Sequence, residues 1–334
     1  MRSRPTQKDV AEKAGVSQAT VSMVLNNAGA RTVSAETVER IKAVAKAIGY
    51  TPNRFAQALK TRKTMTVACI VPDITNPFSP RLIRGVQNVA RAHNYDVMTV
   101  DTDSSPSRER HFLSWAMQGR VDGVIGVFFH LRVPDLSPLL DAGIAVVRVE
   151  SSRKIGGAKP IDDIFIDSKA ASMAVTERLW RAGHRRIAMV AGAGGPERVR
   201  VEGYREQLSA FGAEPHVIVD EAFNEVGGLR AGERILEDGF EPTAIFAAND
   251  LMAIGVIRAL RERGLDIPKD VAVFGFDDIP AARLVSPPLS TVTQFQEDLG
   301  EKAAAILLER LNGEREGAGS THEMPFQLIE RESV

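Results

Sequence analysis

Short apolar runs and segments with helical periodicity alternate along most of the chain. The runs predict buried strands at 66–71, 96–100, 123–129, 144–149, 186–191, 216–219, 244–248 and 271–276. Apolar residues that recur every three or four positions predict helices near 80–93, 107–118, 169–182, 199–211, 227–238, 251–263 and 296–312. Strands that alternate with helices form parallel sheets covered on both faces, so this part of the chain is expected to be α/β.

The number of predicted strands indicates more than one sheet. At least eight strands in about 270 residues exceed what one doubly wound sheet needs, so we expect two lobes that face a cleft. Ligands of such sheets bind beyond the carboxyl ends of the strands. The polar residues that follow each apolar run are therefore the candidates for a binding site.

The first 49 residues have a different pattern, which predicts three short helices over 7–14, 18–26 and 35–48. Each begins after a residue that can cap a helix, and the first and third end at a glycine. The capping residues are Thr6, Ser17 and Ser34, and the glycines are Gly15 and Gly49. A helix, a short turn with glycine and a second helix make a helix-turn-helix motif.

The second of these helices has one apolar face, formed by Val21, Val24 and Leu25. Its other face is small or polar and consists of Gln18, Ala19, Ser22, Met23 and Asn26. Such a face can enter the major groove of DNA, which is wide enough to admit a helix. The alternative is a small helical bundle with a solvated basic face.

The charge is divided unevenly along the chain, although the whole carries a formal net charge of only −1. Residues 1–63 contain 12 Lys and Arg against four Asp and Glu, a net charge of +8. The other 271 residues contain 30 basic and 39 acidic residues, a net charge of −9. A basic segment beside an acidic one is typical of proteins that bind nucleic acid.

Several classes of protein are disfavoured. Cys69 is the only cysteine, so a disulfide-stapled secreted domain is excluded. No apolar run approaches the roughly 18 residues of a membrane span, and the basic N-terminus lacks the apolar core of a signal peptide. We therefore expect a soluble, cytoplasmic protein, associated with the nucleoid.

The sequence has no P-loop, G-x-S-x-G or HExxH motif and no metal-ligand spacing, so we expect no enzyme activity, cofactor or metal.

The basic segment closely resembles a known DNA-binding head. The stretch Asp9–Asn26 reads DVAEKAGVSQATVSMVLN, and the similarity continues through VSAET at 33–37 and GYTPNRFAQALK at 49–60. These residues resemble the head of the LacI/GalR family of transcriptional repressors. The resemblance implies DNA contacts from Thr6, Ser17, Gln18, Ala19, Thr20, Ser22, Met23, Asn26, Asn53, Arg54, Ala58, Leu59 and Lys60.

By that resemblance, Gln18, Ala19 and Met23 occupy the positions that read bases. Many relatives have Arg where this chain has Met23, and Met23 cannot donate to guanine. Residues 50–63 correspond to a hinge that becomes helical when two copies meet in the minor groove, where Leu59 would wedge open a base step. Few of these side chains can form hydrogen bonds with bases, so DNA shape and the hinge are expected to contribute to operator specificity.

The rest of the chain resembles the family's effector domain, which is similar to periplasmic sugar-binding proteins. We expect a DNA-binding domain at 1–49, a hinge at 50–63 and an effector and dimerisation domain at 64–334. Lobe 1 should span about 64–163 and 293–323, and lobe 2 about 164–292 and 324–334. The resemblance implies ligand contacts from Asp73, Asn76, Phe78, Phe128, Glu150, Arg200, Phe223, Asn249, Asp277 and Gln294.

The chemistry of these residues favours a neutral sugar or polyol. Arginine donates to hydroxyl groups, aspartate accepts from them, and an aromatic ring covers the C–H face of a sugar. A purine-like effector is the alternative, and either inducer or corepressor logic is open. The predicted function is a homodimeric repressor that binds a pseudo-palindromic operator and responds to this ligand. A sugar-binding protein that does not bind DNA is the less favoured alternative.

Overall fold

The computed structural model describes residues 5–25, 33–51, 58, 61, 63–150, 152–153, 158–193 and 195–334. It divides into two units, Met1–Thr64 and Met65–Val334. We refer to them as the head and the body.

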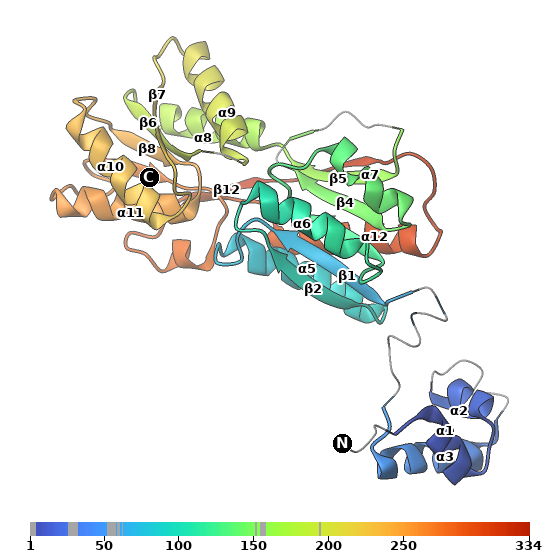
Figure 1. The fold of residues 1–334 in the computed structure, drawn as a ribbon. Helices are drawn as coiled ribbons and strands as arrows, with labels where there is room; N and C mark the ends of the chain where they lie inside the picture. The colour runs from blue at the N-terminus through green and yellow to red at the C-terminus, as the bar shows by residue number, and fades with distance from the viewer. Residues whose placement is uncertain are drawn as a thin grey trace. The chain divides into compact units, whose positions relative to one another are not determined.

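Three helices pack around a small apolar core in the head: α1 (Gln7–Ala14), α2 (Gln18–Leu25) and α3 (Ala35–Ile48) (Figure 1). Val10, Val21 and Ile41 are fully buried in that core. The predicted caps are present: Thr6 and Asp9 form a capping box, and the Ser34 side chain accepts from the backbone N–H of Thr37. The helical head that the sequence predicts is confirmed.

The first lobe of the body is built on a six-stranded parallel sheet with the order β11-β5-β4-β3-β1-β2. Its strands are β1 (Thr66–Val71), β2 (Asp96–Asp101), β3 (Gly123–Gly126), β4 (Ala145–Glu150), β5 (Ile161–Ile166) and β11 (Thr321–Met324). Side chains of β1 alternate between two cores: Val67 and Cys69 face one, and Ala68 and Ile70 face the other. Burial on both faces explains why β1 is a continuous apolar run.

Helices cover both faces of this sheet. The core that contains Val67 includes residues of α5 (Phe78–Ala92) and α12 (Gln296–Leu311). The core that contains Ala68 includes residues of α6 (Pro106–Ala116) and α7 (Val133–Asp141).

The second lobe has a four-stranded parallel sheet with the order β7-β6-β8-β9. Its strands are β6 (Ile187–Gly192), β7 (His216–Asp220), β8 (Ala244–Ala247) and β9 (Ala272–Phe274). One core includes residues of α8 (Ser168–Arg181) and α9 (Glu197–Ala210), and the other includes residues of α10 (Glu225–Glu237) and α11 (Asp250–Glu262) (Figure 1). The predicted α/β fold with two lobes is confirmed.

Three segments cross between the lobes, at 166–168, 293–296 and 324–327. The first joins β5 to α8, and the second joins β10 (Thr291–Thr293) to α12. The third joins β11 to β12 (Gln327–Ile329), which pairs antiparallel with β10. A short 3₁₀ helix, η2 (Pro280–Arg283), precedes β10. We call 293–296 the second crossing segment.

Some elements differ from the prediction made from the apolar pattern. The predicted strand at 123–129 ends at Gly126, and β5, α7, β10, β11 and β12 are additional elements. β5 does not look like a buried strand because it contains Asp162 and Asp163, yet all its residues are buried. Arginines pair with both carboxylates: Arg310 Nε lies 2.7 Å from Asp162 Oδ2, and Arg148 Nε lies 2.7 Å from Asp163 Oδ1. Paired charges are tolerated in such a position.

Candidate DNA-binding face and ligand site

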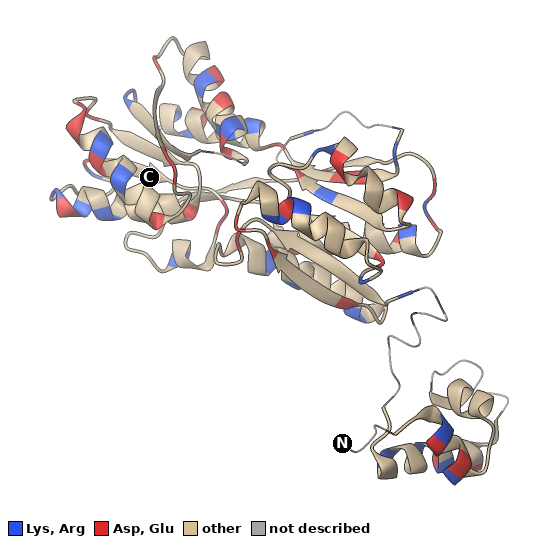
Figure 2. Cartoon of the chain, in the orientation of Figure 1, with Lys and Arg blue, Asp and Glu red and all other residues tan. Residues whose placement is uncertain are grey.

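Helix α2 presents an uncharged polar face. Val21 and Val24 are buried against α1 and α3, while Gln18 and Ala19 are exposed and Met23 is half-buried. Figure 2 colours charged residues on α1 and α3 and none on α2. Such an uncharged face could approach base edges, and basic residues on the neighbouring helices, such as Lys13 and Lys46, could attract phosphates.

Hydrogen bonds hold the start of α2. The Ser17 hydroxyl accepts from the Thr20 backbone N–H at 3.1 Å and lies 2.9 Å from the Thr20 hydroxyl. The Gln7 side chain of α1 donates to the carbonyl oxygen of Gln18 at 3.1 Å. Thr6 caps α1, and its backbone hydrogen bond to Asp9 lowers the pKa of that carboxyl. Gln7 was not among the predicted residues, because nothing in its local pattern links it to α2.

Part of the predicted DNA contact set lies outside the described residues, namely Asn26, Asn53, Arg54, Leu59 and Lys60. Ala58 is described and half-buried, as are Thr20 and Ser22. The DNA contacts of this set stay predictions.

In the body, Arg200 and Asp277 form the centre of a buried polar cluster. Arg200 is 3% exposed; its Nη1 donates to the Ala248 carbonyl oxygen, and its Nη2 lies 3.5 Å from Asp277 Oδ1. The guanidinium lies over the Phe276 ring, 3.7 Å from the centroid. Gln294 donates to Asp277 Oδ1 at 2.5 Å, and Gln296 donates to the Asp277 carbonyl oxygen.

Two more predicted residues lie beside this cluster. Asn249 caps α11 by accepting from the Met252 N–H at 2.7 Å, and its amide donates to the Phe223 carbonyl oxygen at 3.1 Å. Asn249 directly follows Ala248, which binds Arg200. The structure therefore brings together five of the predicted ligand residues: Arg200, Phe223, Asn249, Asp277 and Gln294.

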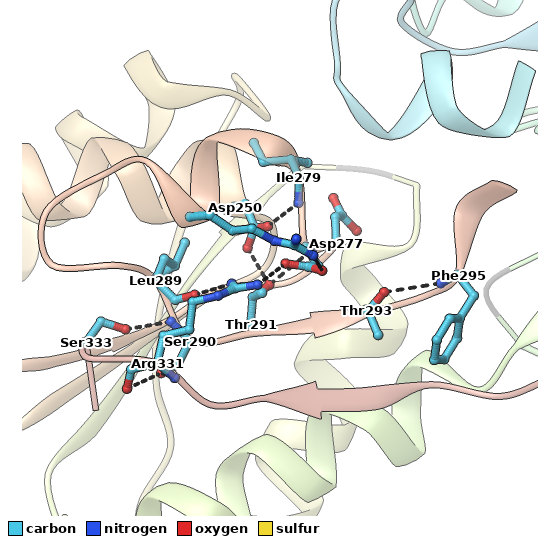
Figure 3. A network of polar contacts seen from close by, with 12 residues as sticks. Asp250, Asp277, Ile279, Leu289, Ser290, Thr291, Thr293, Phe295, Arg331 and Ser333 are labelled. Atoms are coloured by element: carbon cyan, nitrogen blue, oxygen red, sulfur yellow. Dashed lines mark hydrogen bonds and ion pairs between the residues drawn. The ribbon is translucent and has the colours of Figure 1, made fainter. Parts of the chain in front are cut away.

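A second network fixes the loop that carries Asp277 (Figure 3). Asp250 accepts from the Thr291 hydroxyl at 2.5 Å and from the Ile279 backbone N–H at 2.9 Å. Arg331 donates to Asp278 Oδ1 at 2.5 Å and to the Leu289 carbonyl oxygen at 2.6 Å. Asp277 and Asp278 have φ of 114° and 50°, a conformation that non-glycine residues adopt at a cost and keep only when their surroundings hold it.

Burial governs the electrostatics of the site. Desolvation raises the pKa of Asp277 to about 6, and the nearby Arg200 opposes the rise. Desolvation also raises the pKa of Asp250 well above its usual range, and the charge of Asp277 adds to the effect. Both carboxyls therefore hold a proton at higher pH than an exposed aspartate does.

The predicted residues of lobe 1 make local contacts. Asp73 accepts from the Thr75 backbone and hydroxyl at 2.7 and 2.6 Å, and Asn76 accepts from the Phe78 N–H at 3.0 Å, so both shape the turn before α5. Phe78 is half-buried and packs on the core beneath α5. Glu150 forms an ion pair with Arg148, with 3.0 Å between Oε1 and Nη1. Their ligand contacts stay predictions.

Phe128 packs in the lobe 1 core on the side of α6 and α7. The next residue, Phe129, approaches lobe 2 instead: a Cβ added at Gly195 would lie 2.7 Å from Phe129 Cζ. Glu109 fixes this loop, because its buried carboxylate accepts from the backbone N–H groups of Phe129, His130 and Leu131 at 2.9, 3.1 and 3.0 Å. Glu109 was not among the predicted residues, because it lies between two arginines and has the pattern of a solvated helix.

Glu197, at the start of α9, was also not among the predicted residues. It is only 2% exposed, and desolvation raises its pKa to about 7. Its position three residues before Arg200 places both side chains on one face of the helix, which is the only signal the sequence offers.

Comparison with known proteins identifies the family. Residues 6–53 match the family model of bacterial regulatory proteins, lacI family, and residues 176–334 match the periplasmic binding protein-like domain. Catabolite control protein A of Priestia megaterium is 32% identical over 331 residues, which cover 98% of each chain. The chain belongs to the lacI family. The LacI/GalR resemblance found in the sequence is thus confirmed, and this lacI-family protein is a DNA-binding transcriptional repressor.

Solved structures agree with this assignment. A Lac repressor dimer bound to operator and the anti-inducer ONPF has a TM-score of 0.87 and 26% identity, with 99% of each chain covered. A transcriptional regulator CelR–cellobiose complex has a TM-score of 0.73 and 31% identity, and covers 99% of this chain and 100% of that one. These relatives are regulators rather than enzymes; the absence of catalysis in this lacI-family chain stays a prediction. Within the described residues, no helix is both long and apolar enough to cross a membrane.

Proposed function

We propose that two copies of the chain bind a pseudo-palindromic operator through α2 and the hinge, and that a neutral sugar or polyol between the lobes controls this binding. The CelR relative was solved with cellobiose, and the Lac repressor relative as a dimer on its operator. The buried cluster around Arg200 and Asp277 has the donors and acceptors that hydroxyl groups require.

The observation that carries the proposal is the link between this cluster and the second crossing segment. Gln294 and Gln296 belong to that segment, and both donate to Asp277. A ligand that binds Asp277 or Arg200 competes with these hydrogen bonds or reinforces them. The free energy of ligand binding thereby depends on the angle between the lobes, which is the requirement for coupling to a second site.

The test is an operator-binding assay on the full chain. An operator is selected from a random DNA library, and its dissociation constant is measured by anisotropy with neutral sugars, polyols and nucleosides. A neutral sugar or polyol should change operator affinity at least about fivefold, in the range of typical couplings. A decrease identifies an inducer and an increase a corepressor.

Arg200→Ala should abolish the response while leaving operator binding without ligand in place. Arg258→Ala is the matched control, because Arg258 is exposed on α11 and pairs with Glu262. If only nucleosides changed operator affinity, the purine alternative would replace the sugar. If no compound did, the proposed regulation would be wrong.

A further inference from the structure

Two polar atoms of α9 are buried without a hydrogen-bond partner among the described residues, Glu197 Oε2 and Arg200 Nε. Their residues are 2% and 3% exposed and stand one helical turn apart. A buried carboxylate oxygen or guanidinium N–H without a partner is costly, and proteins retain such groups mostly where function requires them. Glu197 Oε2 can accept a hydrogen bond, and Arg200 Nε can donate one.

The surroundings place Glu197 at the boundary between the lobes. A Cβ added at Gly192 would lie 2.6 Å from Phe223 Cδ2 and 3.1 Å from Glu197 Oε1. One added at Gly195 would lie 2.7 Å from Phe129 Cζ and 3.0 Å from Glu197 Oε2. The carboxylate therefore lies beside a glycine loop and near two phenyl rings, Phe223 of lobe 2 and Phe129 of lobe 1.

We propose that Glu197 is a specificity-determining residue of the effector site, where it acts with Arg200 Nε to bind adjacent hydroxyl groups of a neutral sugar or polyol. The inference rests on the proposed function and adds the group that selects the ligand. A hydroxyl both donates and accepts, so two neighbouring hydroxyls satisfy Oε2 and Nε together. The two rings can cover the C–H face of the same ligand.

Charged ligands do not fit this pair. Above about pH 7 Glu197 is an anion, so a sugar acid or sugar phosphate would bring a second anion against it, and an amino sugar would bring a second cation against Arg200. Next to groups as buried as these, like charges at close range raise the free energy of the complex. Selection against charged analogues is thus expected from the two groups together.

The test measures binding to the full chain by calorimetry. The neutral probes are ribose, glucose, cellobiose and sorbitol; gluconate and glucose 6-phosphate are the anions, and glucosamine is the cation. At least one neutral probe should bind the wild type more tightly than every charged probe. Glu197→Gln should lower the affinity for that probe by about tenfold or more and reduce the discrimination against the anions. Glu202 is exposed on the same helix beside Lys169, so Glu202→Gln should change neither the affinity for the neutral probe nor the discrimination against the anions.

Thermal unfolding without ligand separates a binding role from a structural one. Because Glu197 Oε2 has no partner, Glu197→Gln should leave the melting temperature unchanged or raise it. A marked decrease in the melting temperature of Glu197→Gln would overturn the assignment. So would equal affinity of wild type and Glu197→Gln for the neutral probe, tighter binding of a charged probe than of every neutral one, or no binding of any neutral probe. A probe that binds through Glu197 but does not change operator affinity would leave the assignment standing and contradict the proposed regulation.

Discussion

At the residue scale, the chemistry of this protein depends on a few side chains with unusual surroundings. Arg200 is held by Ala248, Asp277 and the Phe276 ring, whereas Glu197 Oε2 has no partner among the described residues. In the head, Met23 occupies a position predicted to read bases, yet it has no group that can donate or accept strongly. Both features lead to predictions for single substitutions.

Met23→Arg should add a base contact. A half-buried Met on α2 would be replaced by a side chain that can donate two hydrogen bonds to guanine, which is worth about 1–3 kcal/mol of discrimination. Operators selected from a random library should therefore acquire guanine at the contacted position. Met23→Leu is the control and should leave the base preference as it is. An unchanged preference in Met23→Arg would show that this position does not face a base.

Glu197→Gln should change how stability depends on pH. Burial raises the pKa of Glu197 from its ordinary 4.5 to about 7, so the folded protein holds a proton that the unfolded chain releases at lower pH. Stability from this group is fully present below pH 4.5 and is lost as pH rises through about 7. Arg200 opposes the shift and Asp277 adds to it.

The melting temperature of the wild type should therefore fall more steeply between pH 5 and pH 8 than that of Glu197→Gln. Asp250 and Asp277 titrate in the same direction but remain in both proteins, so the difference between the curves isolates Glu197. Parallel curves would mean that Glu197 is charged throughout this range.

At the element scale, close helix packing depends on glycines. In lobe 2, α10 and α11 cross where Gly228 meets the Met252 backbone and Gly255 meets the Glu225 carbonyl oxygen, so a Cβ at either would collide with main chain. This contact supports Asn249, which caps α11 and binds Phe223. The helix pair thus positions Asn249 and Phe223, two residues of the proposed ligand site.

Gly255→Ala should destabilise the body. Alanine favours a helix by about 1 kcal/mol over glycine, but a methyl group forced against the α10 backbone costs more, roughly 1–3 kcal/mol and above for contacts this close. We expect a net decrease in the free energy of unfolding, measured in urea. Glu237→Ala, on the exposed face of α10, should stay within about 0.5 kcal/mol of wild type. A Gly255→Ala protein as stable as wild type would contradict the close contact.

At the scale of the whole molecule, the two units carry opposite charge. Residues 1–63 have a net charge of +8 and the remainder −9, so the near-neutral total conceals a basic unit for DNA and an acidic unit with a different ligand. Attraction between the basic unit and phosphates is independent of sequence and is screened by salt.

Operator affinity should therefore fall steeply with salt. A dimer that makes 6–10 phosphate contacts loses about 10³–10⁵ in affinity between 50 and 200 mM salt. Binding of a neutral sugar to the body should change little over the same range, which provides an internal control in one protein. Operator affinity that did not depend on salt would contradict a DNA-binding role for the basic head.

The local patterns of the sequence were enough to predict the helical head with its caps at Thr6 and Ser34, most strands of the body and the α/β class. These features depend on neighbours within a few residues, and buried strands such as β1 are apolar throughout. β5 was missed because Asp162 finds its partner in Arg310, 148 residues away, and no local pattern can reveal such a pair.

The proposed ligand site likewise consists of residues that the sequence could identify and residues that only long-range contacts revealed. Resemblance to a family was sufficient to name Arg200, Asn249, Asp277 and Gln294, but only the tertiary structure connected them to the second crossing segment through Gln296. Only it placed Phe129 and Glu197 at the lobe boundary and showed that Glu109 holds the loop of Phe129, since Phe129 has the pattern of a strand end and both glutamates have that of a solvated helix. Short-range periodicity determines which elements form, whereas burial and long-range hydrogen bonds determine which polar side chains are brought together and which are left without a partner.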